Sequence, residues 1–442
     1  MRFKVAIIFL LFFFLSVLVF QANRLNAQEK GRSSLEECVT EALANNRSLS
    51  AKKEKIEQSI LLKKQARSEF LPKLSTTYSY TRFDEQKTFR STLMGGGEIA
   101  VSSLNNYQWR GTVTQPLFTG FALISSYELA KLGIDQSTIG VELEKLDLTL
   151  RVKEAYYDIL KADKAVEVAR KAVESLDSHV DVARSYYKVG MIPVNDLLKA
   201  EVELGNAKHD LIKARNGSKL ARSSLNFVLS RRIDASINVE DILVYVPERG
   251  DLQEYLERAF HNRPEIRLLD VNIKQADEQI VLARSGNYPG IVLSYDYIKE
   301  GDDPGVSGSD FHDSSSWQVM AALSWTFWEW GKTNYSIEEK RSFRRELLET
   351  RSALKDGISL EVYEAVLALE ETEQNIPTTK KAVEQAEENL RVSQERYKAQ
   401  VTTSTEVLDA QTLLTQARTN YFSALYDHNL ARANLKRALG TY

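Results

Sequence analysis

Apolar residues recur every three or four positions along two long parts of the chain. From Ile124 to Tyr187 there is no proline, and the stretch that follows the next short Gly and Pro interruption repeats the spacing. A sustained seven-residue apolar period predicts helices that supercoil around each other along a narrow seam. The pattern recurs in the C-terminal half, so we predict two antiparallel helical hairpins, which turn at residues 188–196 and 398–406. The predicted seam of the first hairpin is Val166, Ala169, Val173, Leu176, Val180, Ala183, Tyr187, Ala200, Leu204 and Ala207.

The predicted helices are too long for a compact globule. An arm of about 65 residues is on the order of 100 Å long at about 1.5 Å per residue. Faces outside the seam also carry small apolar residues, such as Ala162, Ala165 and Val168. A helix with two apolar seams has neighbours on two sides, so we expect the helices to lie side by side in a curved wall.

A different period marks the stretches between the predicted helices, residues 72–118 and 288–330. Apolar and polar side chains alternate in YQWRGTVTQ, from Tyr107, and in WQVMAALSWTF, from Trp317, where Trp325 and Phe327 continue the apolar series. Period two over about ten residues, with aromatic residues at the ends, is typical of a transmembrane β-barrel. A soluble hairpin with one buried face shows the same alternation and is the alternative. The barrel interpretation assigns the lumen side to Gln108, Arg110, Thr112 and Gln318.

The chain contains one unit twice. Tyr187 matches Tyr397 at 397 − 187 = 210, and Leu35 matches Leu252 at 252 − 35 = 217. Such self-similarity is the sequence signature of a repeated architecture. We therefore predict repeats at 34–230 and 251–440, each with the order helix-strand-strand-helix-helix-helix, joined by residues 231–250. In that joining segment, VEDILVYV is a candidate short strand.

Four predicted strands cannot close a barrel by themselves. An unpaired backbone group inside a bilayer costs several kcal/mol, so a membrane-spanning sheet has no open edge. Closed barrels begin at about eight strands. Two copies would supply eight strands and three would supply twelve, and twelve leave room for a channel. The sequence therefore predicts a homo-oligomer that shares one barrel.

Composition excludes some partners and adds little else. The net charge is −3 with 27% charged residues, which gives no basic surface for nucleic acid. The single Cys38 rules out an internal disulfide and is interpreted as a small apolar residue. The 8 Pro and 20 Gly are few for 442 residues, as long helices require.

Residues 1–27 have the features of a secretory signal peptide. Two early positive charges precede an apolar run from Val5 to Phe20 and a polar stretch that ends at Ala27. An uncleaved membrane anchor is the alternative, because the run is only slightly shorter than a membrane span. Cleavage would leave residues 28–442 as one exported body.

The sequence gives no sign of enzymatic chemistry, and we expect neither a cofactor nor a metal. The five histidines are scattered, and the Gly95–Gly97 run lacks the Lys-Ser/Thr of a phosphate-binding loop. His312 lies near Asp310 and Asp313, but on an open, Ser-rich loop without the supporting contacts of a metal site.

The chain resembles the TolC-like outer-membrane efflux proteins over nearly all of its mature length. The residues that carry the resemblance are LPKL from Leu71, TQPLFTGF from Thr114, LSWTFWEWGK from Leu323, the two hairpin turns, and LKRALGTY at the C-terminus. The resemblance implies a homotrimer in which a twelve-stranded barrel in the outer membrane continues into a long α-helical barrel across the periplasm. It also implies docking with a periplasmic adaptor (membrane-fusion) protein and an inner-membrane transporter, and it assigns residues 231–250 to an equatorial patch.

The resemblance also assigns functional residues. Glu406 and Asp409 correspond to acidic residues that ring a closed periplasmic aperture, although the family's first residue is one methylene shorter. The adaptor-contacting tips correspond to Gly190, Met191 and Ile192 in the first hairpin and to Gln400, Val401 and Thr402 in the second. The second tip lacks the glycine, which puts equal contact by both tips in doubt. Glu406 and Asp409 are alternatively solvated charges at the start of a helix.

Two functional hypotheses follow. An export duct uses both the helices and the amphipathic strands, whereas a periplasmic or surface coiled-coil tether needs only the helices. The duct would be the outer-membrane channel of a tripartite efflux or type I secretion system. The sequence does not name its cargo.

Overall fold

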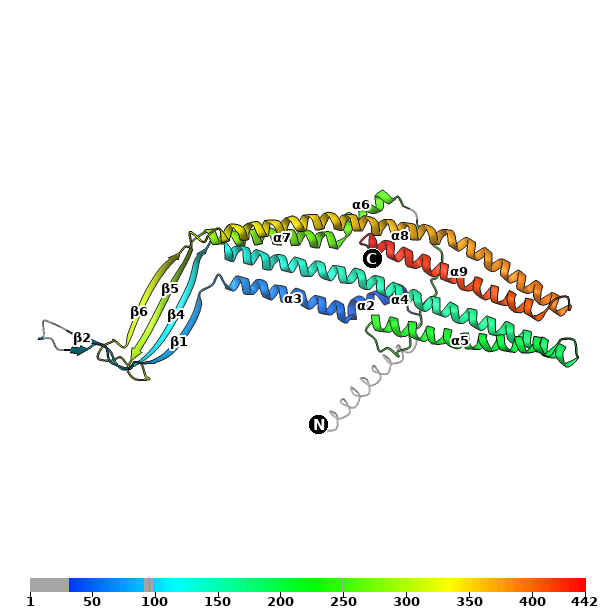
Figure 1. Cartoon of the computed structure of the whole chain (residues 1–442), viewed down its shortest axis with the longest axis horizontal. Helices are drawn as coiled ribbons and strands as arrows, with labels where there is room; N and C mark the ends of the chain where they lie inside the picture. The colour runs from blue at the N-terminus through cyan, green and yellow to red at the C-terminus, as the bar shows by residue number, and fades with distance from the viewer. Residues whose placement is uncertain (1–31, 91–94, 96–97, 249) are drawn as a thin grey trace, which may run out of the picture. The chain divides into compact units, whose positions relative to one another are not determined.

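The computed structural model describes residues 32–90, 95, 98–248 and 250–442, so the predicted signal peptide lies outside the described residues. The chain divides into two compact units. One comprises the residues up to Ala51 together with Val141–Pro264 and Lys355–Tyr442, and the other comprises Lys52–Gly140 and Glu265–Leu354. The second unit contains the sheet and the first part of each long hairpin arm, and the first unit contains the rest of the hairpins with their turns and the segment that joins the repeats (Figure 1).

A four-stranded antiparallel sheet is built from both repeats. Its strands are β1 (Lys73–Arg82), β4 (Asn105–Thr119), β5 (Gly290–Gly301) and β6 (Ser315–Ser324), in the order β1-β4-β5-β6. The register aligns Thr112 with Asp296 and Asp296 with Gln318. Strands β4 and β5, one from each repeat, form the centre, so the duplicated halves join through backbone hydrogen bonds.

Two details of the strand prediction were wrong. Between β1 and β4 lies a short hairpin that the prediction of two strands in residues 72–118 did not include, β2 (Thr88–Arg90) and β3 (Glu98–Ala100), in which Phe89 faces Ile99. The last strand ends at Ser324, so Trp325 and Phe327 follow it instead of continuing it. Alternation of apolar residues does not by itself show where backbone pairing stops, because a chain that leaves the sheet can keep the same spacing.

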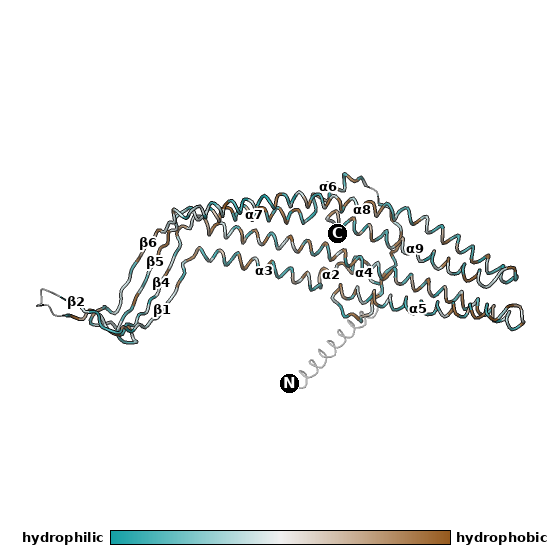
Figure 2. The backbone as a smooth tube through the Cα atoms, viewed as in Figure 1, coloured by the Kyte–Doolittle hydropathy of each residue, from teal (hydrophilic) through white to brown (hydrophobic). Residues whose placement is uncertain are grey.

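Four long helices form the hairpins. The arms α4 (Ala122–Lys188) and α8 (Lys332–Lys398) have 67 residues each, and the return helices α5 (Val194–Val228) and α9 (Ser404–Ala438) have 35 each. Hydrophobic and polar positions alternate in short runs along them (Figure 2). The core of the first hairpin is Leu176, Val180, Ala183, Leu197, Ala200 and Leu204, with Leu408 of α9 packed against it.

The two hairpins differ at one matched pair of tyrosines. Tyr397 is 4% exposed in the core of the second hairpin, whereas Tyr187 is 43% exposed. The predicted placement of Tyr187 in the seam was therefore wrong. Cys38, by contrast, is buried as expected, and burial raises the pKa of its thiol to about 11.

Each repeat begins with a short helix followed by a longer one, so the predicted order helix-strand-strand-helix-helix-helix was wrong: two helices precede the two sheet strands and two follow them. The pairs are α2 (Leu35–Asn45) with α3 (Arg47–Ser68), and α6 (Leu252–Asn262) with α7 (Pro264–Arg284), the last followed by the turn η2 (Ser285–Asn287). Asn46 separates the first pair, and its Nδ2 donates to the carbonyl of Val228, the last residue of α5, at 2.9 Å. Arg263 separates the second pair and donates to the carbonyl of Ala438, the last residue of α9, at 3.3 Å. Both repeats thus satisfy a free helix-end carbonyl in the same way.

The joining segment 231–250 is held by side chains of the helices. Asn226 of α5 donates to Ala235 O at 2.7 Å, and Asn429 of α9 donates to Val244 O at 3.1 Å. Among the described residues of this segment, the only β-type pairing is an isolated bridge from Val239 to Ser33. The expectation of a strand in VEDILVYV was wrong because the helices, and no neighbouring strand, bind these carbonyls.

Substitution of Asn46 tests how much its side chain stabilises the start of α3. Its Oδ1 accepts from Ser48 N at 2.9 Å and from Leu49 N at 3.2 Å, while its Nδ2 binds the end of α5. Replacing Asn46 by Ala removes the cap of α3 and a part-buried hydrogen bond, so we expect the free energy of unfolding to fall by about 1–3 kcal/mol. Asn45→Ala, at an exposed neighbouring position, is the control and should change it by less than about 0.5 kcal/mol in the same denaturant titration. Equal effects of the two substitutions would contradict the capping role.

Candidate functional site

One face of the sheet carries two sets of hydrogen-bonded polar side chains. Thr112 Oγ1 donates to Asp296 Oδ1 at 2.6 Å, and Gln318 Nε2 donates to Asp296 Oδ2 at 2.9 Å. Gln108 Nε2 donates to Glu300 Oε1 at 2.5 Å, and Arg110 donates to Gln108 Oε1 at 3.5 Å. The structure therefore brings the four residues predicted for a lumen side onto one face of the sheet.

Sequence reasoning missed the carboxylate in each of these sets. Asp296 links β4, β5 and β6, and Glu300 binds the side chain of Gln108. The signal was present, because Ser294, Asp296 and Ile298 alternate with Tyr295 and Tyr297 in the third strand. The position of Ile298 between the two acids weakened that alternation.

The opposite face is apolar and open to solvent in the single chain. Leu74 is 80% exposed, Trp317 is 67% exposed and Leu323 is 64% exposed. The register pairs Tyr78 with Trp109 and Tyr80 with Tyr107 on the same face. A sheet with one polar face and one exposed apolar face suits an apolar environment on one side and water on the other.

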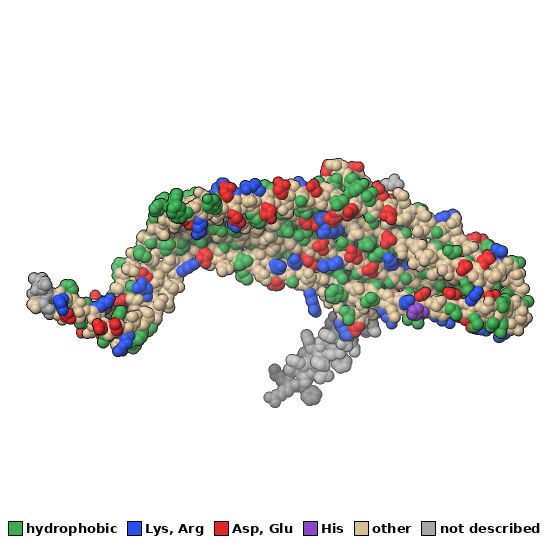
Figure 3. Space-filling model, in the orientation of Figure 1, with side chains coloured by type: hydrophobic (Ala, Val, Ile, Leu, Met, Phe, Trp, Pro, Cys, Tyr) green, Lys and Arg blue, Asp and Glu red, His purple; other side chains and the backbone are tan. Residues whose placement is uncertain are grey.

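Aromatic side chains gather where the sheet leads into helix. Trp330, immediately before α8, is 83% exposed, and Phe327 is 80% exposed. Figure 3 shows hydrophobic side chains concentrated where β6 leads to α8. Exposed Trp and Tyr are characteristic of the boundary between lipid and water.

The hairpin tips lie close together in the first unit. Gly190 has φ +75° and Gln400 has φ +58°, so both turns use a left-handed residue although only one is glycine. The tip residues Met191 and Val401 are exposed, and Gln400 Nε2 lies 3.0 Å from Met191 Sδ. The missing glycine therefore leaves the turn of the second hairpin unchanged.

Glu406 and Asp409 lie in the first turns of α9 with different surroundings. Glu406 pairs with Arg396 of α8 at 3.3 Å and accepts a hydrogen bond from Thr402. Within the part of the chain that the structure describes, Asp409 makes no ion pair, and it lines a groove together with Leu198 and Val202 of α5. The charge of Glu406 is thus partly neutralised within the chain, which its sequence neighbours did not indicate.

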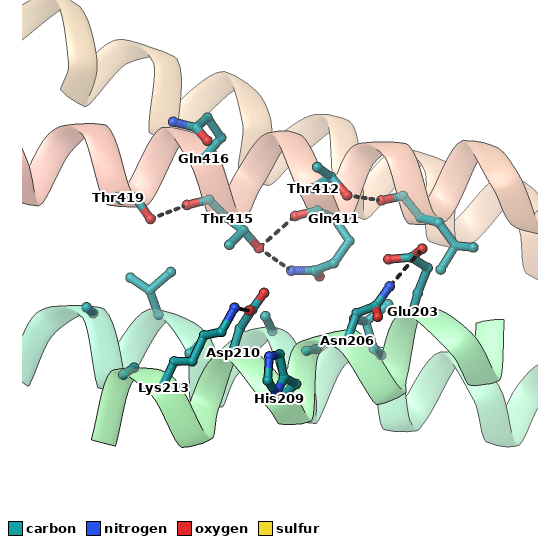
Figure 4. Close-up of a pocket in the computed structure, with 18 residues that line it drawn as sticks. Glu203, Asn206, His209, Asp210, Lys213, Gln411, Thr412, Thr415, Gln416 and Thr419 are labelled. Carbon is teal, nitrogen blue, oxygen red and sulfur yellow. Dashed lines mark hydrogen bonds and ion pairs between the residues drawn. The ribbon is translucent and has the colours of Figure 1, made fainter. Parts of the chain in front are cut away.

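A larger groove of about 670 Å³ lies further along the same helices (Figure 4). Small residues of α4, such as Ala169 and Ala172, form one side, and polar residues of α9 form the other. Gln411 extends from α9 toward α4 and α5, and its Nε2 donates to Thr415 Oγ1 at 3.1 Å. Thr412 and Thr415 donate their hydroxyl groups to carbonyls of α9 itself.

Neither a metal centre nor a spanning helix is found among the described residues. No group of three or more His, Cys, Asp or Glu there is arranged to hold a metal ion, and this includes His312, Asp310 and Asp313. No helix in residues 32–90, 98–248 or 250–442 has a stretch long and apolar enough to cross a bilayer.

Comparisons with known proteins agree over most of the chain. A family model described as outer membrane efflux protein matches residues 38–231 and 255–441. Outer membrane protein TolC of Escherichia coli (strain K12) is 23% identical over 404 residues, which cover 85% of this chain and 76% of that protein. TolC of Vibrio cholerae is 23% identical over 394 residues, covering 85% of this chain and 83% of that protein.

Solved structures share the fold. The Campylobacter jejuni CmeC outer membrane channel superposes with a TM-score of 0.77 at 16% identity, covering 92% of this chain and 85% of CmeC. The open state of the Neisseria gonorrhoeae MtrE outer membrane channel superposes with a TM-score of 0.74 at 21% identity, covering 92% of this chain and 89% of MtrE. Both of these proteins are described as outer membrane channels. The family model covers well over half of the chain, so the resemblance is confirmed: this protein belongs to the outer membrane efflux protein family and is an outer-membrane exit duct.

Proposed function

We propose that three copies of this chain share one closed twelve-stranded barrel in the outer membrane, and that the helices continue it as a duct into the periplasm. Cargo would reach the duct from an inner-membrane transporter through a periplasmic adaptor. The tether hypothesis is less favoured, because it gives the two-faced sheet no role.

The open edges of the sheet carry this proposal. Strands β1 and β6 lie at the ends of the order β1-β4-β5-β6, and no other strand of the described residues pairs with their outer edges. A bilayer does not tolerate such edges. If β6 of one copy pairs with β1 of the next, three copies supply 3 × 4 = 12 strands and leave no edge.

Chemical contrast between the two faces supports the orientation of the barrel. The face with Leu74, Trp317 and Leu323 would contact lipid, and the face with Gln108, Arg110, Thr112 and Gln318 would line the lumen. The exposed Trp330 and Phe327 would lie at the periplasmic boundary of the membrane, where an indole ring has both apolar and polar neighbours.

The helical tips would form the periplasmic aperture and the adaptor contact. Three copies of Glu406 and Asp409 around a constriction would attract cations. Arg396 offsets part of the charge of Glu406, so Asp409 would contribute more of the field. Exposed Met191 and Val401 offer apolar contacts to an adaptor, and the matched backbone of Gly190 and Gln400 supports similar docking of both tips.

Adjacent residues of β6 test which face meets lipid. Val319→Lys would place a charge on the proposed lipid face and cost about 2–4 kcal/mol near the bilayer midplane. We expect a large loss of heat-resistant oligomer from the outer-membrane fraction. Gln318→Lys is the matched control on the opposite face, where Asp296 would accept the new ammonium group, and it should assemble normally. Normal assembly of both variants would refute the assignment of faces.

Block by multivalent cations tests the aperture. The double variant Glu406→Gln/Asp409→Asn should raise the half-blocking concentration at least about tenfold in single-channel recordings, equivalent to about 1.4 kcal/mol. Glu384→Gln/Glu388→Gln removes two exposed charges from the same hairpin and should leave the block unchanged. An unaltered block in the first variant would remove these residues from the constriction.

A further inference from the structure

A buried histidine joins the two helical hairpins close to their tips. His179 of α4 is 7% exposed, and its Nε2 hydrogen-bonds Ser404 Oγ at 2.8 Å. Ser404 is the first residue of α9 and is 1% exposed. The imidazole also packs against the ring of Tyr397 of α8, with 4.9 Å between the ring centroids. A single side chain of the first hairpin thus contacts both helices of the second.

This contact fixes the start of the helix that carries the acidic residues. Ser404 precedes Glu406 by two residues and Asp409 by five. Thr403, the residue that caps α9, makes no side-chain hydrogen bond to the helix, so α9 lacks the usual local anchor at its first turn. Further contact from α4 comes from Tyr186, whose hydroxyl donates to Lys398 O at 3.1 Å, and from Ser175, which accepts from Gln394 at 3.5 Å.

Helix α8 contains a weak point that α4 lacks. Pro377 lies inside α8, and a proline has no N–H for the carbonyl four residues earlier, that of Glu373. Thr378 and Thr379 donate to carbonyls of the preceding turn at 3.1 and 2.8 Å, a contact that favours helix bending. The matched position in α4 is Glu167, since 377 − 210 = 167, in an uninterrupted helical stretch.

Before Pro377, α8 is held by hydrogen bonds outside the hairpin tips. Beyond it, the second hairpin is held to the first by the His179 contact, by the hydrogen bonds of Tyr186 and Ser175, and by apolar packing that includes Leu408 and Tyr397. Glu373 Oε1 accepts from Glu248 N at 3.2 Å, and Thr372 Oγ1 lies 3.4 Å from His428 Nδ1. Release of the contacts around His179 would therefore free the segment of α8 between Pro377 and the tip, and the start of α9 with it.

We propose that His179 is a positioning residue that holds the start of α9 at neutral pH, and that its protonation releases the second hairpin and opens the periplasmic end. This inference rests on the proposed function, since it gives that aperture a pH-dependent control.

The surroundings of His179 favour the neutral ring. Burial lowers the pKa of His179 below its usual 6.5, and the positive end of α9 also opposes an imidazolium ion at Ser404. Charged groups on the four neighbouring helices pair among themselves. The pairs are Asp181–Arg184 on α4 at 3.2 Å, Arg184–Glu201 between α4 and α5 at 3.0 Å, Glu395–Lys398 on α8 at 3.1 Å, and Arg396–Glu406 between α8 and α9 at 3.3 Å. Asp196 of α5 lies near Tyr397, and its negative charge adds to burial in raising the pKa of the Tyr397 hydroxyl.

The direction of the pH effect follows from this lowered pKa. The released ring takes up a proton near pH 6.5 and the held ring only at lower pH, so the held state loses stability as pH falls below about 6.5. At pH 5.5 the released state gains at most roughly tenfold per copy, the limit reached when the held ring takes up no proton.

Single-channel recording of the assembled wild-type protein at pH 7.5 and 5.5 tests the proposal. The fraction of time spent in the high-conductance state should rise at pH 5.5, by up to about tenfold for each copy whose release opening requires. His179→Gln keeps a neutral hydrogen-bonding side chain, so it should remain in the low-conductance state at both pH values. His209→Gln, at an exposed histidine of α5, is the matched control and should respond as the wild type does.

A third variant tests the same contact in case His179→Gln does not fold. Ser404→Ala retains His179 but removes its partner, and it should raise the open fraction already at pH 7.5. A wild-type channel that conducts without a pH response between 7.5 and 5.5 would overturn the role of His179 alone, as would a response that persists in His179→Gln. Assembled protein that conducts at neither pH would overturn the proposed duct together with it.

Discussion

The unpaired backbone at the two edges of a four-stranded sheet is the constraint on which the rest of the structure depends. Strands β1 and β6 offer hydrogen-bonding groups that no strand of the described residues satisfies, and one face of the sheet is apolar and exposed. Unpaired strand edges alone, or an exposed apolar face alone, can be covered in several ways. Together they support the proposal that further copies of the same chain supply the missing strand edges and continue the apolar face.

Duplication has preserved backbone conformation more faithfully than residue type. Four left-handed positions recur at the offset of 210, namely Gly120 with Trp330, Phe121 with Gly331, Gly190 with Gln400, and Ser230 with Gly440. Each pair contains one glycine and one residue that is strained in this conformation. The packing of helices and strands in each repeat therefore imposes the left-handed conformation of the turn. At the strand-to-helix junctions this conformation is adopted by the exposed aromatic residues Phe121 and Trp330.

The sequence was sufficient for the long helices and for the alternating faces of the sheet, because these depend on periodic patterns over many residues, but it gave the wrong order of elements within the repeat. It did not reveal contacts between residues far apart in the chain. Asp296 joins three strands only through the register, and Arg396 reaches Glu406 only across the second turn. The role of His179 depends on Ser404, 225 residues away. The end of β6 was missed because Trp325 and Phe327 keep the strand's spacing after pairing has stopped.

Counting the copies in the assembled protein tests the central claim most directly. Native mass spectrometry of protein extracted gently from outer membranes gives that number without reference to conductance or cargo. Closure of a shared barrel predicts a mass of three mature chains, with the mass of one chain absent until the assembly is denatured. A stable, folded species with the mass of a single chain would contradict the account, because its strand edges would then have no partner in the membrane.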